Sequence, residues 1–572
     1  MRLSVSKSAN ATSFYIIKSV TINGKRTSKV VEKLGTYKEL KKKLKGIDPQ
    51  DWATKYVEKL NAEEKRGRVE VIKKFSNTKR ILKGNQTHYN GGYLFLQSLY
   101  NELGLKRICK NISNRYRFKF DLNSILSKLI YTRILYPSSK RSSFEAAKKF
   151  IEKPAFDLHH IYRTLGVLAK ENHYIQSELY KTSRRMLAHN SKILYYDCTN
   201  YFFEIEQESG IKQYGVSKEH RPNPIVQMGL FMDANGIPLA FCLNPGNRNE
   251  QQSLIPIEKR IMEDFKLSKF VVCTDAGLNS QTNRLFNSFG DRAYVTTQSI
   301  KKMPGYLQDW VFGNDSWHRL GSNKTFRIED IDDSEDNNIY YKSRTVKEKD
   351  LTDQLIVTYS PKYKRYLRAI REKQIMRAHE KMKNSKSLKN RGQNDPKRFI
   401  SSVHCTKEGE IAAHEVLAID KERINYEEAF DGYYAVRTNL EAEPWEIVKI
   451  NKSRWEIEQS FRIMKSEFNA RPVFLSRDDR ILAHFLTCFI SLLIYRILEQ
   501  RLYSNFKDKI QSTESVIKVL RNMDFYKLNG EGYVPIYTRT DETDALHQLF
   551  GFRTDTEIVT KRDMKKIINK TK

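Results

Sequence analysis

The chain has 572 residues, enough for about three or four domains with hydrophobic cores of their own. It carries 101 Lys and Arg against 68 Asp and Glu, a formal net charge of +33, and such a charge attracts polyanions, of which nucleic acid is the commonest large one. The six cysteines form no C-x-x-C pair, which excludes a zinc ribbon or a disulfide framework, and no G-x-x-x-x-G-K-[ST] motif supports an ATP-driven motor.

Targeting and membrane signals are weak. The scattered cysteines fit a reducing cytoplasm, and the N-terminus lacks the apolar segment of a secretory signal. The most apolar run, Phe485 to Tyr495, is too short to span a bilayer and is flanked by His484 and Arg496. We interpret this run as a buried helix and expect a cytoplasmic protein without a membrane partner.

Residues 1–90 are strongly basic, with 22 Lys and Arg against 8 acidic residues. Strands are predicted at Phe14 to Ile22 and Arg26 to Leu34, joined by a hairpin turn at Asn23-Gly24. The stretch after the second strand is basic and has a helical pattern. We expect this region to bind DNA.

Residues 91–190 repeat Leu, Ile and Tyr at helical spacing, with breaks near Pro137 and Pro154. The pattern predicts a helical region. Because no helix-turn-helix register is clear, a DNA-binding role and a scaffold role remain equally open for this region.

Residues 191–300 alternate β-rich runs with amphipathic segments, which predicts a mixed sheet with helices packed on it. A hairpin turn is expected at Asp233 to Gly236. The predicted strands are Ile193–Thr199, Ile225–Phe231, Ile237–Leu243, Phe270–Thr274 and Ala293–Gln298, and the predicted helices are Gln251–Phe265 and Asn279–Phe289.

Residues 301–440 are β-rich and interrupt that pattern. The predicted strands are Lys324–Glu329, Asn338–Thr345, Gln354–Ser360, Ile411–Ile419 and Tyr433–Thr438.

Two charged segments lie within this region. The acidic run Glu329 to Asp336 lacks the spacing and glycine of a calcium loop, so we expect a solvated loop. Residues 361–397 hold thirteen Lys and Arg against three acidic residues, which favours contact with a DNA backbone over a plain solvated helix. Residues 441–505 are helical in pattern, and 506–572 form a mixed, basic tail.

The helical segment beginning at Arg454 has two stripes. Its apolar stripe consists of Ile457, Phe461, Met464 and Phe468. Arg454, Glu458 and Lys465 fall within roughly 40° of one another at the edge of that stripe. A carboxylate held between two cations there can bind a divalent metal while its neighbours hold phosphates, although the same spacing also suits surface ion pairs.

Two aspartates follow β-runs that are expected to lie side by side. Asp197 lies inside an apolar strand, where a charge is costly unless it binds something, although a buried, hydrogen-bonded aspartate is the alternative. Asp275 lies at the carboxyl end of a strand, where ligands gather in open α/β sheets, although it could also cap the following helix. With Glu458 the two could hold a pair of Mg²⁺ ions about 4 Å apart.

These residues resemble the DDE transposases of bacterial insertion sequences, in the cut-and-paste class with a Tyr-(2)-Arg-(3)-Glu-(6)-Lys signature. Arg454, Glu458 and Lys465 match that spacing, and Asp197 and Asp275 match the two aspartate blocks. The likeness extends to the segments Gly215–Pro222 and Pro245–Asn247, and it covers residues 191–500 well and residues 1–190 more loosely. One departure is that Asn451 occupies the position of the signature tyrosine.

The resemblance implies an α/β fold: a ribonuclease H-like mixed sheet with flanking helices, a β-rich insertion domain at 301–440 and a mostly helical N-terminal region. In this organisation 191–300 is the first part of the core and 441–505 carries its Glu-bearing helices.

The resemblance also implies an activity and a site. Asp197, Asp275 and Glu458 would be the catalytic metal ligands, binding two Mg²⁺ or Mn²⁺ ions, and Arg454, Lys465 and Arg462 would contact DNA. The implied reaction is DNA cleavage at the element's ends followed by strand transfer into target DNA, without ATP.

The implied partner is double-stranded DNA, both the terminal inverted repeats and the target, bound by a homodimer at the bacterial nucleoid. Two alternatives are a metal-dependent nuclease without strand transfer and a non-catalytic DNA-binding protein derived from a transposase. The three intact carboxylates argue against the second alternative.

Overall fold

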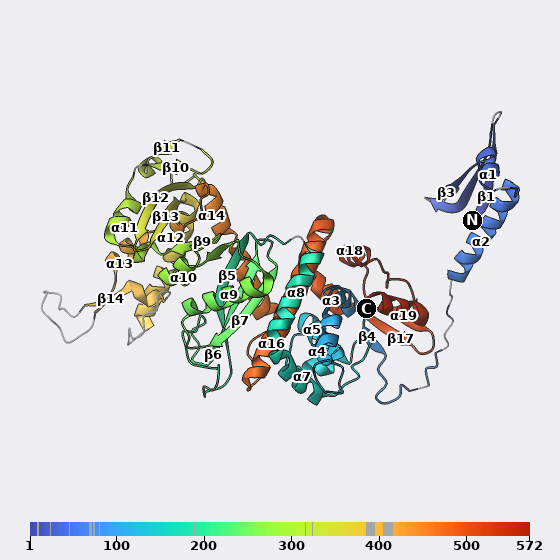
Figure 1. Cartoon of the computed structure of the whole chain (residues 1–572), viewed down its shortest axis with the longest axis horizontal. Coiled ribbons are helices and arrows are strands. Elements are labelled where there is room, and N and C mark those ends of the chain that lie inside the picture. Colours follow the sequence, from blue (N-terminus) through green and yellow to red (C-terminus); the bar gives the residue numbers. More distant parts are fainter. Residues whose placement is uncertain are drawn as a thin grey trace. The chain divides into compact units, whose positions relative to one another are not determined.

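The computed structural model describes residues 1–572 except 9–10, 23–24, 45, 68–70, 72–74, 79, 188, 315, 323, 385–394 and 404–415. The chain divides into two compact units. One unit comprises Met1–Thr87 with the short segments Lys527–Val534 and Glu557–Met564, and the other contains the rest of the chain (Figure 1).

The N-terminal residues form a three-stranded antiparallel sheet with two helices and a small core around Phe14, Leu40 and Ala53. The predicted hairpin is confirmed, since Ile22 pairs with Lys25, while its turn at Asn23-Gly24 lies outside the described residues. The basic stretch after the hairpin is helical, as predicted, and β1 is a further strand that the sequence did not predict. The elements are β1 (Arg2–Lys7), β2 (Thr12–Ile22), β3 (Lys25–Thr36), α1 (Tyr37–Lys43) and α2 (Pro49–Gly67).

Residues 91–190 are helical, as predicted. The helices are interrupted near Pro137, where α5 has ended, and near Pro154, between α6 and α7. After the short strand β4 (His88–Asn90), the helices are α3 (Tyr93–Glu102), α4 (Leu105–Ser113), α5 (Leu122–Leu135), α6 (Lys140–Ala147), α7 (Leu158–Lys170) and α8 (Asn172–Met186).

The centre of the larger unit is a ten-stranded mixed sheet in the order β11-β10-β12-β13-β16-β9-β8-β5-β6-β7. Strand β5 is antiparallel to β6 and parallel to β8, and β8 is parallel to β9. The β7-β6-β5-β8-β9 part is consistent with the ribonuclease H-like core that the resemblance implies. The strands of this part are β5 (Ile193–Phe202), β6 (Ile225–Asp233), β7 (Pro238–Pro245), β8 (Val271–Thr274) and β9 (Ala293–Gln298).

Five strands of 301–440 extend the same sheet, and two others form a separate pair. Strand β16 pairs with β9 on one side and with β13 on the other, so the sheet continues without a break from the core strands into the later ones. The added strands are β10 (Trp317–Arg319), β11 (Thr325–Phe326), β12 (Tyr340–Glu348), β13 (Leu351–Tyr359) and β16 (Tyr433–Thr438).

Two sequence predictions in this region need correction. The strand predicted at Lys324–Glu329 is reduced to Thr325–Phe326, because the chain turns into a 3-10 helix at Ile328–Asp330. The helix predicted at Asn279–Phe289 is only α10 (Gln281–Phe286), which begins after the side chain of Ser280 caps it. The first part of the strand predicted at Ile411–Ile419 lies outside the described residues, and Val416–Ile419 forms β15.

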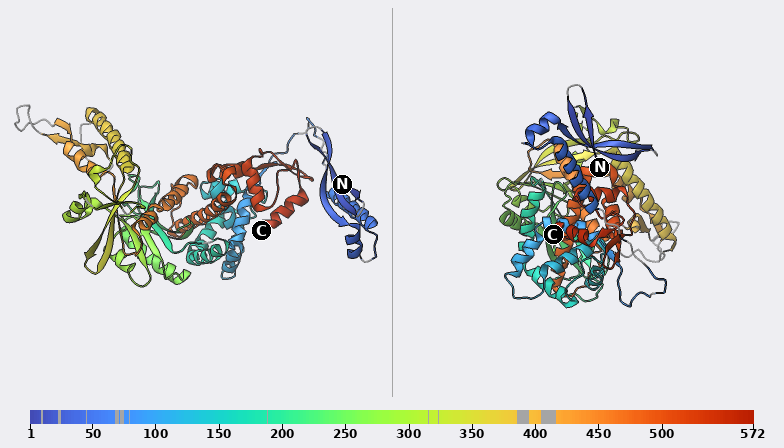
Figure 2. Two further views of the ribbon diagram at one scale, coloured as in Figure 1. Left: turned by 90° about the horizontal axis from the view of Figure 1, so that it is seen from above. Right: turned by 90° about the vertical axis from the view of Figure 1, so that its right-hand side faces the viewer.

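The basic segment 361–397 forms the long helix α12 (Pro361–Asn384), which packs beside the β14–β15 hairpin (Figure 2). Several of its cations are already paired within the protein: Lys364 with Asp333, and Arg371 with Asp431. The acidic run is exposed in part, as predicted, but it is anchored on this helix. The elements around α12 are α11 (Gly305–Phe312), β14 (Ile400–Val403), β15 (Val416–Ile419) and α13 (Lys421–Glu428).

Helices cover both faces of the core strands. On one face Leu194, Tyr196 and Cys198 of β5 pack with α8 and α9 (Leu254–Phe265). On the other face the Tyr195 hydroxyl donates to the Ile450 carbonyl, and Tyr201 packs on Phe485. The second face therefore faces α14 (Pro444–Lys452), α15 (Trp455–Arg462) and α16 (Asp478–Phe506).

The long helix α16 is the centre of the helical layer (Figure 1). The predicted buried helix at Phe485 to Tyr495 is confirmed within it. By length and composition the span Asp478–Lys509 could cross a membrane, but 94% of its most apolar window is buried inside the protein, as in a core helix. The C-terminal elements are α17 (Thr513–Asn522), β17 (Asp524–Leu528), β18 (Gly532–Pro535), α18 (Asp541–Phe550), β19 (Val559–Thr560) and α19 (Lys561–Lys570).

Candidate active site

Asp197 lies on β5, and Asp275 lies just after the end of the adjacent strand β8. The parallel register pairs Tyr195 of β5 with Cys273 of β8, and the charge of Asp275 acts on the Asp197 carboxylate. Because side chains alternate along a strand, Asp197 shares the face of Tyr195 and Tyr201 that looks toward α14, α15 and α16. The two aspartates are thus presented to the helices that follow the sheet.

Glu458 reaches the same place from α15, and Arg454 connects it to the sheet. The Arg454 guanidinium lies 3.0 Å from the Glu458 carboxylate and 4.0 Å from that of Asp197. Burial alone would lower the pKa of Arg454. Its ionisable neighbours outweigh burial and raise this pKa above its usual value. In decreasing order of effect, these neighbours are Asp197, Glu458, Tyr434 and Asp275. Arg454 therefore pairs with Asp197 and Glu458, and the charge of Asp275 acts on it more weakly.

The helix that carries Glu458 is held in place by its buried apolar stripe and by hydrogen bonds from α16. Ile457, Phe461, Met464 and Phe468 are all buried, as the sequence predicted. The buried guanidinium of Arg496 on α16 donates to the Ser460 hydroxyl at 2.8 Å and to the Glu456 carbonyl at 3.1 Å. After Arg462 the helix widens into a π-helical segment, Ile463–Glu467.

Lys465 lies in that π-helical segment and is mostly buried. Its ammonium group is 3.6 Å from the Glu219 carboxylate and above the ring of Tyr201. Burial and then the charge of Lys218 lower the pKa of Lys465 to about 8, while Asp197 acts in the opposite direction. Lys465 therefore lies beside the aspartates, as its spacing from Glu458 suggested.

Arg462 lies elsewhere. Its side chain is exposed, and its electrostatic neighbours are Glu467 and Glu514, the latter on α17. Within the described part of the chain, no interaction joins Arg462 to the three carboxylates. Its predicted contact with DNA stays a prediction.

Lys218 is a site residue that sequence reasoning did not single out, although the segment containing it was noted. Its ammonium group donates to the Cys198 carbonyl and lies 3.4 Å from the Glu250 carboxylate. Burial opposes its charge, but Asp197, Glu250 and Asp275 together raise its pKa above the usual value. A second cation thus stands beside the aspartate pair.

The donor chemistry of the site fits hard divalent cations. Burial, and next the charge of Asp275, raise the pKa of Asp197 to about 7. A bound cation would relieve this repulsion.

A comparison with known protein families matches residues 202–494 to a family described as "Transposase DDE domain". The match spans slightly more than half of the 572 residues. The chain belongs to the DDE transposase family.

The DDE-domain match includes Asp275 and Glu458 and begins in β5 just after Asp197. Among solved structures, the chain is similar to one titled "Cryo-EM structure of piggyBac transposase synaptic complex with hairpin DNA", with 9% sequence identity, a TM-score of 0.37, and coverage of 84% of this chain and 85% of that one. No curated protein sequence matches the chain.

At the position of the signature tyrosine, this DDE domain has Asn451, whose amide donates to the Tyr434 hydroxyl at 3.0 Å. The Thr297 hydroxyl lies 2.6 Å from the same phenol oxygen. Tyr434 belongs to β16, in the later part of the sheet, and it interacts electrostatically with Arg454. Another tyrosine therefore stands beside the site, and no local sequence signal marks it.

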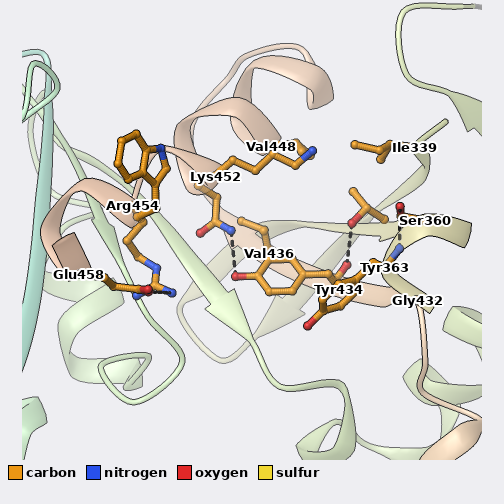
Figure 3. Close-up of a pocket in the computed structure, with 13 residues that line it drawn as sticks. Ile339, Ser360, Tyr363, Gly432, Tyr434, Val436, Val448, Lys452, Arg454 and Glu458 are labelled. Carbon is orange, nitrogen blue, oxygen red and sulfur yellow. Dashed lines mark hydrogen bonds and ion pairs between the residues drawn. The ribbon is translucent and has the colours of Figure 1, made fainter. Parts of the chain in front are cut away.

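A pocket of about 340 Å³ opens beside Arg454 and Glu458 of the DDE domain (Figure 3). Its wall combines residues of β16 and α12, such as Tyr434 and Tyr363, with the helices that bear the candidate site. The indole of Trp455 forms part of the lining and is 55% exposed. The candidate site is therefore open to solvent on the side of the later strands.

The raised pKa of Asp197 gives a prediction for the metal-free protein. Because this pKa is about 7 in the folded state and 3.8 ordinarily, ionisation of Asp197 costs stability as the pH rises from about 4 to 7. In EDTA at pH 8, we expect the free energy of unfolding of Asp197→Asn to exceed that of the wild type by on the order of 1 kcal/mol or more. Its unfolding temperature should be higher accordingly. The difference should shrink as the pH falls from 7 to 4.

Differential scanning calorimetry measures this effect, and Asp291→Asn is the matched control because Asp291 is exposed in the turn before β9. Equal unfolding temperatures for Asp197→Asn and the wild type at pH 8 would contradict the proposed repulsion. Added Mg²⁺ should stabilise the wild type and leave Asp197→Asn nearly unchanged.

Proposed function

We propose that the protein is a transposase that cuts DNA at the ends of its element and transfers the freed 3′ ends to target DNA. The observation that carries this proposal is that Asp275, just after β8, acts electrostatically on Asp197 of the paired strand β5, and that Arg454 links Asp197 to Glu458. The DDE-domain match supports the same conclusion. We also propose that strands β5 to β9 form a ribonuclease H-like core.

In this proposal Asp197, Asp275 and Glu458 hold two Mg²⁺ or Mn²⁺ ions. Bound there, the ions would activate the attacking oxygen and neutralise charge that develops on the scissile phosphate. Exchange of one phosphodiester for another conserves the bond energy, so strand transfer requires no ATP.

The cations around the carboxylates position the DNA. Asp197 and Glu458 hold Arg454 in the metal-free protein, and Arg454 would be free to bind a phosphate if metal ions neutralised those carboxylates. Lys465 and Lys218 flank Asp197 and can hold the neighbouring phosphates. Arg462, exposed on the outer side of the same helix, is assigned to a more distant part of the DNA backbone.

The proposed partners are double-stranded terminal repeats and target DNA, held by a dimer that brings two ends together. The net charge of +33 supports binding to the phosphate backbone. The same proposal places the protein at the nucleoid in a bacterial cytoplasm.

A joining assay tests the function. The protein is incubated with labelled DNA carrying the ends of its own element, a supercoiled target plasmid and Mg²⁺. We expect label to appear covalently joined to the plasmid. Nicking without joining would identify a nuclease instead, and binding without any cleavage in either Mg²⁺ or Mn²⁺ would identify a DNA-binding protein derived from a transposase.

A further inference from the structure

A second pocket, of about 500 Å³, lies beyond the carboxyl end of β5. One wall is the connection between α5 and α6, and the other is the loop after the π-helical segment, where the Val473 amide donates to the Phe202 carbonyl. We call it the Lys140 pocket. It is separate from the pocket beside Glu458, and its basic lining residues are Arg133, Lys140, Arg471 and His484.

The basic groups of the Lys140 pocket have no anionic partner in its lining, because no Asp or Glu is among the residues described around it. Lys140 is only 5% exposed, and its ammonium nitrogen has no hydrogen-bond partner. Arg133 is 2% exposed and donates to the Phe468 and Ser138 carbonyls, but its Nε atom has no partner. Buried charge without compensation is costly, so the pocket is incomplete as it stands.

The lowered pKa values of Lys140 and His484 agree with a missing anion in the pocket. Burial and then the charge of Arg133 lower the pKa of Lys140 to about 7. The pKa of His484 falls well below its usual value because of burial and the charges of Lys140 and Arg133. An oxyanion bound among them supplies charge-assisted hydrogen bonds and restores the charged form of Lys140.

The Lys140 pocket is connected to the candidate active site through ion pairs. Arg471 in its wall pairs with Glu219, and Glu219 also pairs with Lys465 at 3.6 Å. Lys465 in turn lies beside Asp197. Two ion pairs therefore link the wall of this pocket to Lys465, which lies beside Asp197.

We propose that the Lys140 pocket binds a phosphate of the DNA strand that passes through the active site, with Lys140 and Arg133 as the principal ligands. The identity of the ligand as DNA rests on the proposed function, whereas the binding of an oxyanion rests on the pocket alone. At the mouth of the pocket the Phe474 ring is 66% exposed, which leaves the pocket accessible from the surface.

The first test uses inorganic phosphate and no DNA. The full chain in EDTA is unfolded thermally in increasing sodium phosphate, against sodium chloride at equal ionic strength. We expect a saturable rise in unfolding temperature for the wild type and its absence in Lys140→Met, which keeps the volume and removes the charge. Arg141→Met, an equal change of charge at the exposed neighbouring residue, should respond like the wild type.

The folding of Lys140→Met is checked in the same experiment. Because the substitution removes an uncompensated buried charge, its unfolding temperature without phosphate should equal or exceed that of the wild type. A wild type that responds to phosphate no more than to chloride, or a Lys140→Met variant that responds equally, would overturn the oxyanion site.

The second test asks whether the phosphate belongs to DNA. Binding of a fluorescent 30-base-pair duplex is measured in EDTA, where cleavage does not occur. Lys140→Met should bind on the order of tenfold more weakly than the wild type. Phosphate at constant ionic strength should compete with DNA for the wild type and Arg141→Met but not for Lys140→Met.

The outcomes separate the two proposals. A phosphate response without competition against DNA would retain an oxyanion site and reject DNA as its source. Phosphate binding and competition by a protein that neither cleaves nor joins DNA would instead reject the proposed activity and leave the pocket assignment standing.

Discussion

Replacing Asp197 with Asn is expected to abolish metal-dependent DNA cleavage, by roughly 10³-fold or more, because the substitution removes a charged ligand at the centre of the site. Asp275→Asn and Glu458→Gln should have the same effect. DNA binding in EDTA should remain within about twofold of the wild type, since the basic surface is unchanged. Gel-based cleavage of labelled element ends and fluorescence anisotropy measure the two quantities.

Matched controls come from exposed acidic residues outside the site. Asp291→Asn changes the same chemistry in the turn before β9, and Glu446→Gln does so on α14, beside the Glu-bearing helix. Both should cleave DNA at the rate of the wild type. Full cleavage activity in any one of the three site variants would contradict the assignment of that residue as a metal ligand.

Replacing Asp353 with Ala is expected to destabilise the protein by about 3–5 kcal/mol. The Asp353 carboxylate is fully buried and pairs with Arg284 and with Arg437, the latter at 2.7 Å. It also accepts a hydrogen bond from Tyr294. Without the carboxylate, two guanidinium groups that are 5% and 8% exposed keep only the partly exposed Glu348 carboxylate as a shared anion.

Urea unfolding of the metal-free protein measures this loss. Asp350→Ala, in the exposed turn before the same strand, is the control and should change the free energy of unfolding by less than about 0.5 kcal/mol. A loss below about 1 kcal/mol for Asp353→Ala would mean that the buried network contributes little. Because Asp353 joins β13 to α10, β9 and β16, this experiment tests the attachment of the later strands to the core.

The sequence predicted elements well where hydrophobic periodicity is local. Strands at Ala293–Gln298 and Tyr433–Thr438 have the predicted bounds, and the buried stripe of α15 has the predicted members. The strand predicted at Lys324–Glu329 failed because a short apolar run can equally enter a turn. That β16 pairs with β9 could not be predicted, because residues more than a hundred positions apart in the chain make this pairing and local patterns carry no register between them.

The candidate site shows the same division. The spacing of Arg454, Glu458 and Lys465, and the strand positions of Asp197 and Asp275, were readable because they depend on helical and strand periodicity. Tyr434, Lys218 and Lys140 could not be found in this way, because their roles arise from contacts between distant segments. Arg462 lies one helical turn after Glu458, yet its electrostatic neighbours are Glu467 and Glu514, because local spacing does not reveal which residues of other segments stand opposite it.

The unbroken hydrogen bonding from β9 to β16 makes residues 301–440 inseparable from the part of the molecule that carries the candidate site. If this region were deleted, β9 would become a bare sheet edge, and exposed edges invite aggregation with other chains. The deletion would also remove the phenol that holds Asn451, just ahead of the helix that presents Glu458. A shortened chain lacking residues 301–440 should therefore precipitate rather than behave as a minimal enzyme. In related chains, loss of this region would be tolerated only if another strand paired with β9.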